Sequence, residues 1–439
     1  MRLKHPITPT APTEVPSTPN APWEPRIIVA LHEGFYGTSS GTGFSNRAFL
    51  TALARLLPPG RLAVIATRVP QTSGAHDAQW AAEVRQMLGR AGAEIITVPD
   101  GHELTESVHG CERLCDLVAE GAVRVAGRAG RSLLVGLDVP FLGLAPYTPP
   151  TMELLLVPRS TAALTKRDDR VRVSWERSGL RAAAARGGRV GAISTHMREH
   201  LVVGCAVPAS SVISIPNGLI LEETGTPAAA LPLPVNARGG FLLALGRADP
   251  TKGFEDLLEA LRILKTRGVR LPHLLLVAAT ADEAERPIPY QERLTATIQA
   301  YRLDATLITR FSPAIRSWLH SPALRAVVVP SREEPFGRIP LEAFAAGAGP
   351  VVATTAGGLA QTVIEGETGF TAAPAHPASL AVAIHRALTL LPRERARLRS
   401  SATALLRSRH DYEVSIASAL GRVAPWALAS SSATGDATR

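Results

Sequence analysis

Two glutamates with seven residues between them, Glu334 and Glu342, lie in a segment whose groups suit sugars and anions. The apolar run AVVVP before them predicts a strand, and a helix is expected to begin near Ile339. Glu334 would then follow the carboxyl end of the strand, and Glu342 would lie in the first turns of the helix. Both carboxylates could face one pocket and accept hydrogen bonds from sugar hydroxyls.

The start of that helix offers donors as well. The backbone N–H groups of Gly337, Arg338 and Ile339 have no partner within the helix, and the helix dipole adds positive potential that favours a phosphate. One short segment therefore has groups for both halves of a nucleotide sugar. The spacing leaves a plainer alternative open, in which Glu342 only stabilises its helix terminus and Glu334 is a solvated loop acid.

Two cations follow another predicted strand. The sequence GRADPTKG places Arg247 just past the strand FLLALG and Lys252 at the start of the next helix. Such a pair suits an anion, because arginine offers a planar fork of donors and lysine a point charge. In the alternative interpretation, Lys252 is an exposed turn residue before Gly253.

These residues require strands that end at a common edge. Short β-branched runs alternate with longer amphipathic stretches along most of the chain, as in RIIVALHE, NRAFLTALARLL and RLAVIATR. This alternation predicts an α/β protein with parallel sheets and helices on both faces. The pattern breaks at LILEETGTPAAALPLPVNARGG, whose composition is typical of a linker, and then restarts. We therefore expect two doubly wound Rossmann-like domains facing a cleft, with ligands at the carboxyl ends of the strands.

The composition shifts predict the domain boundaries. Both ends of the chain are poor in core-forming residues, so we expect mobile tails there. The expected organisation is a tail over 1–24, a first domain over 25–216, a hinge over 217–238, a second domain over 239–410, a helix over 411–428 that returns to the first domain, and a tail over 429–439.

Composition excludes several function classes. The 439 residues are 46% hydrophobic and 19% charged, which is typical of a globular protein. The net charge of +9 would suit nucleic acid, but the arginines are scattered and only 5% of residues are aromatic, so we expect no nucleic-acid partner. Three cysteines without zinc-site spacing predict neither a disulfide framework nor a metal site. No apolar run approaches the ~20 residues of a membrane span and no signal peptide is evident, so we expect a cytoplasmic protein without membrane insertion.

Taken together, the motifs resemble those of the retaining family 4 glycosyltransferases of GT-B fold. The resemblance covers about residues 25 to 425 and is most specific from 240 to 372, where the glutamate pair after a PS dipeptide, the GR and KG pairs and the run GPVVATTAGG all match. It implies that Arg247 and Lys252 neutralise the donor diphosphate, that Glu342 holds the ribose and that Glu334 contacts the donor sugar. It also implies a nucleoside-diphosphate sugar as donor, with no cofactor and no essential metal.

The first half resembles the family more loosely. The stretch SSGTGFSNRAFLTALARLL resembles its glycine loop and next helix. This would place Gly43 near the donor phosphate, and Ser45 and Asn46 near the acceptor. An ordinary strand-to-helix turn explains the same pattern.

Two positions depart from the family pattern. Arg159 and Asp138 stand where many members have histidines at strand ends. An arginine cannot act as a base, so Arg159 is expected to be a fixed cation in the cleft that serves catalysis, and Asp138 is expected to contact the acceptor. In the alternative, Arg159 only forms a salt bridge with Asp138 or Glu153.

The resemblance predicts a retaining glycosyltransferase that moves a sugar from a nucleoside-diphosphate sugar to an acceptor hydroxyl, with a small soluble metabolite as one candidate acceptor. Two alternatives stay open. One is a nucleotide-sugar-binding partner protein with weak or no catalysis. The other is a nucleotide-sugar epimerase or phosphorylase of the same fold.

Overall fold

The computed structural model describes residues 25–38, 40–99, 101–127, 130–223, 231–280, 288–310 and 312–428. The expected tails, 1–24 and 429–439, lie outside the described residues, as does the part of the expected hinge over 224–230.

In the described part of the chain, seven parallel strands form the sheet of the first domain, in the order β3-β2-β1-β4-β5-β6-β7. The central strands are almost wholly apolar and buried, as in RIIVAL and SLLVGL, because a parallel sheet is covered on both faces. The strands are β1 (Arg26–Leu31), β2 (Leu62–Thr67), β3 (Glu94–Val98), β4 (Ser132–Leu137), β5 (Glu153–Val157), β6 (Arg189–Ala192) and β7 (Val212–Ser214).

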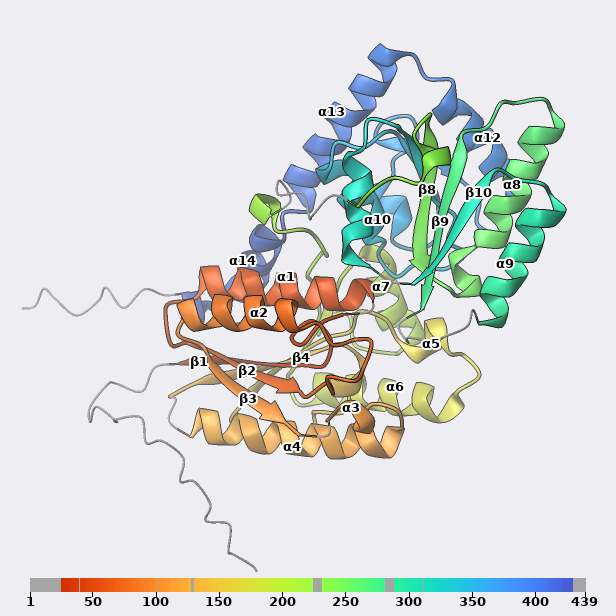
Figure 1. Ribbon diagram of the computed structural model, residues 1–439. Coiled ribbons are helices and arrows are strands. Elements are labelled where there is room, and N and C mark those ends of the chain that lie inside the picture. The colour runs from red at the N-terminus through yellow and green to blue at the C-terminus, as the bar shows by residue number, and fades with distance from the viewer. Residues whose placement is uncertain are drawn as a thin grey trace, which may run out of the picture.

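The helices of this domain form a layer on each side of the sheet. Figure 1 shows α1 and α2 on one face and α4 and α6 on the other. Side chains of Ser40, Asp77 and Ser107 accept hydrogen bonds from backbone N–H groups and so cap α1, α2 and α4. The helices are α1 (Gly41–Leu56), α2 (Ala78–Arg90), α3 (Gly101–Leu104), α4 (Val108–Ala126), α5 (Ala162–Thr165), α6 (Arg170–Ala185) and α7 (Thr195–Glu199).

The second domain repeats this architecture with six parallel strands among its described residues, in the order β10-β9-β8-β11-β12-β13. The strands are β8 (Phe241–Arg247), β9 (His273–Thr280), β10 (Ala305–Arg310), β11 (Leu324–Val329), β12 (Val351–Thr354) and β13 (Gly369–Ala372). The remaining helices of the chain are α8 (Phe254–Thr266), α9 (Pro289–Ala300), α10 (Arg338–Ala345), α11 (Leu359–Thr362), α12 (Pro377–Leu388), α13 (Pro392–Arg409), α14 (Tyr412–Val423) and α15 (Pro425–Leu428). The expected α/β class with two Rossmann-like domains is confirmed.

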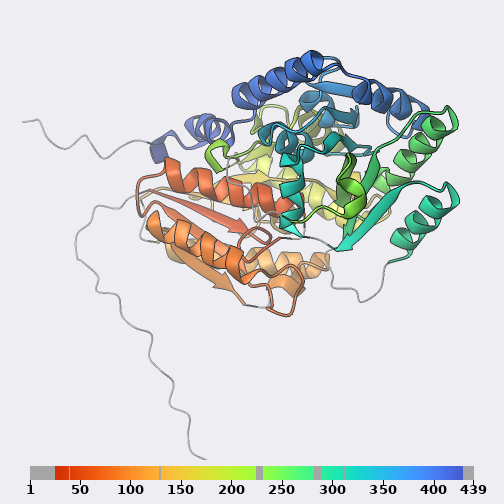
Figure 2. The ribbon, with the colours of Figure 1, turned by 45° about the horizontal axis from the view of Figure 1, so that its top comes forward.

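The end of the chain packs on the first domain. Helix α13 packs against α10 and runs along the second domain toward the first, and α14 lies beside α1, as both ribbon views show (Figures 1 and 2). Tyr412 at the start of α14 is fully buried, and a β-bridge joins Leu219 to Asp411 just before it. One apolar cluster therefore runs from β1 and α1 through α14 into the second domain.

Each sheet has one point where the strand order reverses, between β1 and β4 in the first domain and between β8 and β11 in the second. Connections leave such a point in opposite directions, which opens a crevice at the carboxyl ends of the strands. We therefore expect a ligand to bind at these two crevices.

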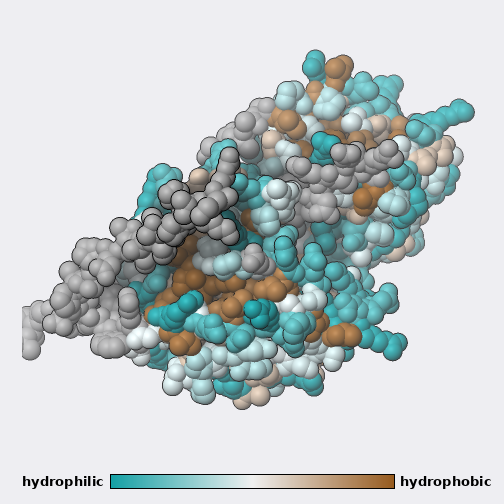
Figure 3. Space-filling view, turned by 60° about the horizontal axis from the view of Figure 1, so that its bottom comes forward, coloured by the Kyte–Doolittle hydropathy of each residue, from teal (hydrophilic) through white to brown (hydrophobic). Residues whose placement is uncertain are grey.

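The surface is mixed in character. Figure 3 shows a face on which an area of hydrophobic residues borders hydrophilic ones. Among the described residues, no helix is long and apolar enough to cross a membrane.

Candidate functional site

The carboxyl ends of the two sheets face each other, because residues that follow strands of one domain contact residues that follow a strand of the other. Ser194, which follows β6, donates its hydroxyl hydrogen to the carbonyl of Pro335 at 2.7 Å. Arg167 forms an ion pair with Glu333 at 2.7 Å. The segment after β11 is therefore bound to the first domain by two contacts, one through Pro335 and one through Glu333.

This segment, residues 330–337, forms a loop between β11 and α10 that we call the donor loop. The loop can turn into α10 because Gly337 adopts φ +91, a backbone conformation that favours glycine. Gly358 donates its backbone N–H to the carbonyl of Glu334 at 2.9 Å. A Cβ on Gly357 would lie 2.1 Å from the same carbonyl, so only glycine allows this approach.

The sequence-predicted residues Lys252 and Glu334 meet at the second crevice. Lys252 Nζ lies 2.6 Å from Glu334 Oε2, and both side chains are largely buried. Lys252 ends a short 3-10 turn, and Gly253 follows with φ +66. A Cβ on Gly253 would lie 2.0 Å from the carbonyl of Pro330, so only glycine allows this approach. The turn and the donor loop are therefore fitted to each other through the backbone.

Arg247 lies nearby, exposed at the end of β8. Burial raises the pKa of Asp249, but hydrogen bonds from Thr251 and the charges of Arg247 and Lys252 outweigh it and hold that pKa below its usual value. Arg247 and Lys252, the two expected cations, thus both lie close enough to Asp249 to lower its pKa.

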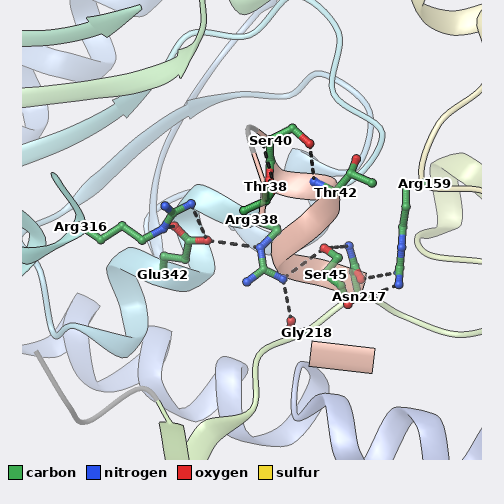
Figure 4. A network of polar contacts seen from close by, with 10 residues as sticks. All are labelled: Thr38, Ser40, Thr42, Ser45, Arg159, Asn217, Gly218, Arg316, Arg338 and Glu342. Atoms are coloured by element: carbon green, nitrogen blue, oxygen red, sulfur yellow. Dashed lines mark hydrogen bonds and ion pairs between the residues drawn. The ribbon is translucent and has the colours of Figure 1, made fainter. Parts of the chain in front are cut away.

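Glu342 of α10 is held by two arginines (Figure 4). Arg316 Nε lies 2.7 Å from Glu342 Oε2, and Arg338 Nε lies 3.2 Å from Glu342 Oε1. Although burial raises the pKa of Glu342, the two guanidinium groups hold it below its ordinary value. Both carboxylate oxygens of Glu342, which were expected to accept hydrogen bonds from the ribose, are therefore occupied by arginine side chains. Arg316 could not be singled out from the sequence, because it comes from a turn over 313–320 that carries no motif.

Arg338 also joins the two domains. Its Nη1 donates to Ser45 Oγ at 3.1 Å and to the carbonyl of Gly218 at 3.3 Å (Figure 4). Arg316 lies on the face of Phe44, 3.8 Å from the ring centroid. The N-terminus of α1 therefore approaches that of α10, and positive potential from two helix ends meets in the cleft.

The structure places Gly43, Ser45 and Asn46 inside the packing of α1. Gly43 is buried, and a Cβ there would lie 2.1 Å from Thr38 Oγ1, so its glycine serves packing. It is Gly41, exposed at the start of α1, that lies near the Arg338 side chain. Ser45 and Asn46 are 1% and 0% exposed, and their side chains bond to protein, so they do not present themselves to an acceptor.

Arg159 is also placed differently from the expectation. Its side chain is only 4% exposed. Its donors reach Asn46 Oδ1 at 2.9 Å, Asn217 Oδ1 at 3.0 Å and Tyr412 Oη at 2.7 Å. Arg159 therefore ties α1, the domain connection and α14 together instead of facing a substrate. Among the described residues, no ion pair joins Arg159 to Asp138 or to Glu153. The Glu153 carboxylate pairs with Arg131 instead, and Asp138 feels the Arg159 charge without a direct ion pair.

Asp138 is the first-domain residue best placed for chemistry. It follows β4 at the first crevice and has φ 74 and ψ −177, a strained combination that non-glycine residues hold mainly at functional sites. Burial, and then the negative charge of Glu33, raise the pKa of Asp138 to about 6. Glu33 follows β1 and accepts the Ser40 hydroxyl at 2.6 Å, and its place at a strand end could have revealed it in the sequence.

Two histidines of the first domain, His32 and His109, lie in different environments. Burial, and then the nearby His102, lower the pKa of His32 to about 4, and His32 Nδ1 lies 2.5 Å from Thr67 Oγ1. His109 is exposed on α4. Among the described residues, no group of three or more His, Cys, Asp or Glu is arranged to hold a metal ion.

Comparisons with known proteins bear on the second domain above all. Residues 232–404 match the model of the family described as glycosyl transferases group 1. A lipopolysaccharide 1,2-N-acetylglucosaminetransferase of Salmonella typhimurium is 30% identical over 213 residues, which are 47% of this chain and 55% of that protein. A D-inositol 3-phosphate glycosyltransferase of Frankia alni is 32% identical over 213 residues, 47% of this chain and 51% of the relative. The chain thus spans about half the length of these relatives.

Solved structures match almost the whole chain at low sequence identity. HepE of Anabaena, in complex with UDP and glucose, has a TM-score of 0.64 at 19% identity and covers 90% of this chain and 99% of its own. A trehalose 6-phosphate synthase of Burkholderia multivorans has a TM-score of 0.68 at 12% identity, covering 92% of this chain and 99% of its own. At these identities the likeness establishes the fold, which is the expected GT-B arrangement.

Proposed function

We propose that this protein, whose residues 232–404 match the family of glycosyl transferases group 1, is a retaining glycosyltransferase that uses a nucleoside-diphosphate sugar. The observation that carries the proposal is the Lys252–Glu334 pair at the β8/β11 crevice, opposite the N-terminus of α1. A cation and a carboxylate at this point suit the two charges that develop when a sugar leaves a diphosphate. The complexes of HepE with UDP and with UDP-glucose support a donor of this class.

The diphosphate would lie among Arg247, Lys252 and the N-terminal N–H groups of α10. When the bond between the anomeric carbon and the phosphate oxygen breaks, negative charge grows on the diphosphate, and these fixed positive groups stabilise it without reorganising. Metal independence is part of the proposal, because these groups supply the positive charge.

Glu334 would act on the other side of the breaking bond. The sugar ring becomes positively charged in the transition state, and a carboxylate near the anomeric carbon stabilises that charge more than it stabilises the neutral donor. The acceptor hydroxyl would attack from the face that the diphosphate leaves. Its oxygen would bond to the anomeric carbon, and its proton would pass to the leaving phosphate oxygen.

Glu342 would take the ribose hydroxyls only if one arginine moves. Arg316 is the better candidate to move, since Arg338 has further acceptors in Ser45 and Gly218. Asp138 would orient the acceptor hydroxyl from the first crevice, where its raised pKa makes it a better proton acceptor.

Donor turnover tests the proposal. The purified protein would be screened with UDP-, GDP- and dTDP-sugars by thermal shift, and the donors that bind would be assayed for hydrolysis and for transfer. Release of a nucleoside diphosphate with the anomeric configuration kept in the product is the expected result. Donor binding without turnover would point to a nucleotide-sugar-binding partner protein, and inversion of configuration would refute the retaining mechanism.

A further inference from the structure

An open hollow of about 680 Å³ lies on the first domain, outside the crevice between β1 and β4. Arg167, Arg170, Arg177 and Arg181 line it. None of its described lining residues is acidic. We call it the arginine hollow. Its size falls within the roughly 300–1,000 Å³ of small-molecule sites.

The shape of the hollow follows from two elements. Arg170, Ser174, Arg177 and Arg181 recur at intervals of four, three and four residues, so they share one face of α6. The opposite wall is formed by Gly204, Cys205 and Ala206, which end a π-helical turn over 200–204. Turns of this kind are uncommon and frequently occur at functional sites.

The positive charge of the hollow is mostly unpaired. Among the described residues, no carboxylate forms an ion pair with Arg170, Arg177 or Arg181. The buried acid of α6, Glu176, is engaged elsewhere, since it pairs with Arg172 and accepts the backbone N–H of Ala162.

The adjoining His200 is affected by the same positive charges. Burial first, then the charges of His196, Arg177 and Arg167, lower the pKa of His200 to about 4. Several guanidinium groups held this close repel one another unless an anion lies between them, and their planar forks fit phosphate oxygens.

The hollow adjoins the transfer site. Arg167 lines the hollow and also pairs with Glu333, whose chain neighbour Glu334 pairs with Lys252. Figure 1 shows α5, which precedes α6, directly beside the second domain. An anion bound in the hollow is therefore separated from the donor loop by a single arginine side chain.

We propose that the arginine hollow binds the phosphate group of a phosphorylated acceptor, while the acceptor's hydroxyl lies in the cleft. The assignment of the ligand as an acceptor rests on the proposed transferase function, whereas binding of phosphate in the hollow does not. The phosphate could be carried by a soluble sugar or polyol phosphate or by a lipid headgroup. The position beside the donor loop favours the soluble acceptor, because the group must reach into a cleft between two domains.

Pyrophosphate binding to the full chain tests the site without any transfer. Calorimetry would be done in the Lys252→Ala background, so that the donor clamp does not mask the hollow. The double variant Arg177→Gln/Arg181→Gln is expected to lower pyrophosphate affinity about tenfold or more, as for lost hydrogen bonds to a charged group. The matched control is Arg397→Gln/Arg407→Gln, which removes two exposed arginines from α13 and should change nothing. An unchanged affinity in the Arg177/Arg181 variant would overturn the site.

Two further arms identify the source of the phosphate. In the Lys252-containing protein, transfer to sugar phosphates should show a KM raised about tenfold by the Arg177→Gln/Arg181→Gln change, with kcat within about twofold. Binding to phosphatidylcholine–phosphatidylglycerol vesicles should be weak in every variant. Strong vesicle binding that disappears in the Arg177/Arg181 variant would overturn the soluble-acceptor assignment. Pyrophosphate binding in the hollow of a protein that turns over no nucleotide sugar would instead refute the transferase function and leave the anion site standing.

Discussion

Lys252 Nζ and Glu334 Oε2 lie 2.6 Å apart, although 82 positions separate the two residues in the chain. Each side chain is 17% exposed, so the pair is shielded from water and neutralises itself before a donor arrives. A bound diphosphate would compete for the lysine, and a developing sugar cation would compete for the glutamate. The pair therefore shields both charges from bulk solvent until a bound substrate interacts with each of them.

Replacing Lys252 by alanine should weaken the binding of a nucleoside diphosphate. The loss is expected to be ~1.5–3 kcal/mol, the range for a hydrogen bond to a charged group, or roughly 10- to 150-fold in Kd by calorimetry. The nucleoside without phosphates is the control and should bind both proteins equally. Equal weakening of both ligands would show that the lysine supports the fold instead.

Glu334→Gln should separate binding from chemistry. The amide keeps the shape of the side chain but not its charge, which matters most as the sugar becomes cationic. We expect donor Kd within about threefold of the parent and kcat lower by on the order of a hundredfold. A turnover number that stays the same would move the chemistry to another residue.

Arg159→Ala should destabilise the protein instead of acting on the acceptor. Its removal leaves Asn46, Asn217 and Tyr412 without a charged donor, so we expect a loss of about 2–4 kcal/mol in the free energy of unfolding. Denaturant unfolding measures it. Arg55→Ala is the matched control, because Arg55 also links α1 to α14 through Glu413 but at the surface, where an ion pair contributes about 0–1 kcal/mol. Normal stability with lost transfer in Arg159→Ala would restore the expected role in the cleft.

Asp138 should make stability depend on pH. Its folded pKa of about 6 lies above the usual value of 3.8, so the folded protein favours the protonated carboxyl. The contribution of this protonated carboxyl to the free energy of unfolding is fully present below about pH 4 and is lost as the pH rises through 6. Asp138→Asn should therefore be more stable than the parent at pH 8, by up to on the order of 3 kcal/mol, and equally stable at pH 4. Thermal unfolding at both pH values measures this difference, and equal stability at pH 8 would show that the carboxylate is not strained by its charge.

Removal of divalent metal should leave transfer intact. The charge on the leaving diphosphate is balanced by Arg247, Lys252 and the N-terminus of α10, so activity in EDTA should match activity without it. Complete loss in EDTA that manganese restores would contradict this prediction.

Much of the scaffold and part of the site could be predicted from the sequence, because both depend on local pattern. Alternating apolar strands and amphipathic helices require parallel sheets, and the break after Gly218 separates two of them. Glu334, Gly337 and Glu342 belong to one strand–loop–helix segment, so their spacing alone brings them to one edge of a sheet. The local order of residue types is sufficient for such features.

The tertiary structure decided where side chains point and what neutralises them. Arg159 ends a strand, and only the docking of α14 on α1 turns it inward to Tyr412. Arg316 meets Glu342 through a turn that has no motif, and the arginines of α6 form a hollow only because the turn after α7 stands opposite them. Burial and charge pairing depend on segments brought together by folding, and periodicity along one segment carries no information about its partners.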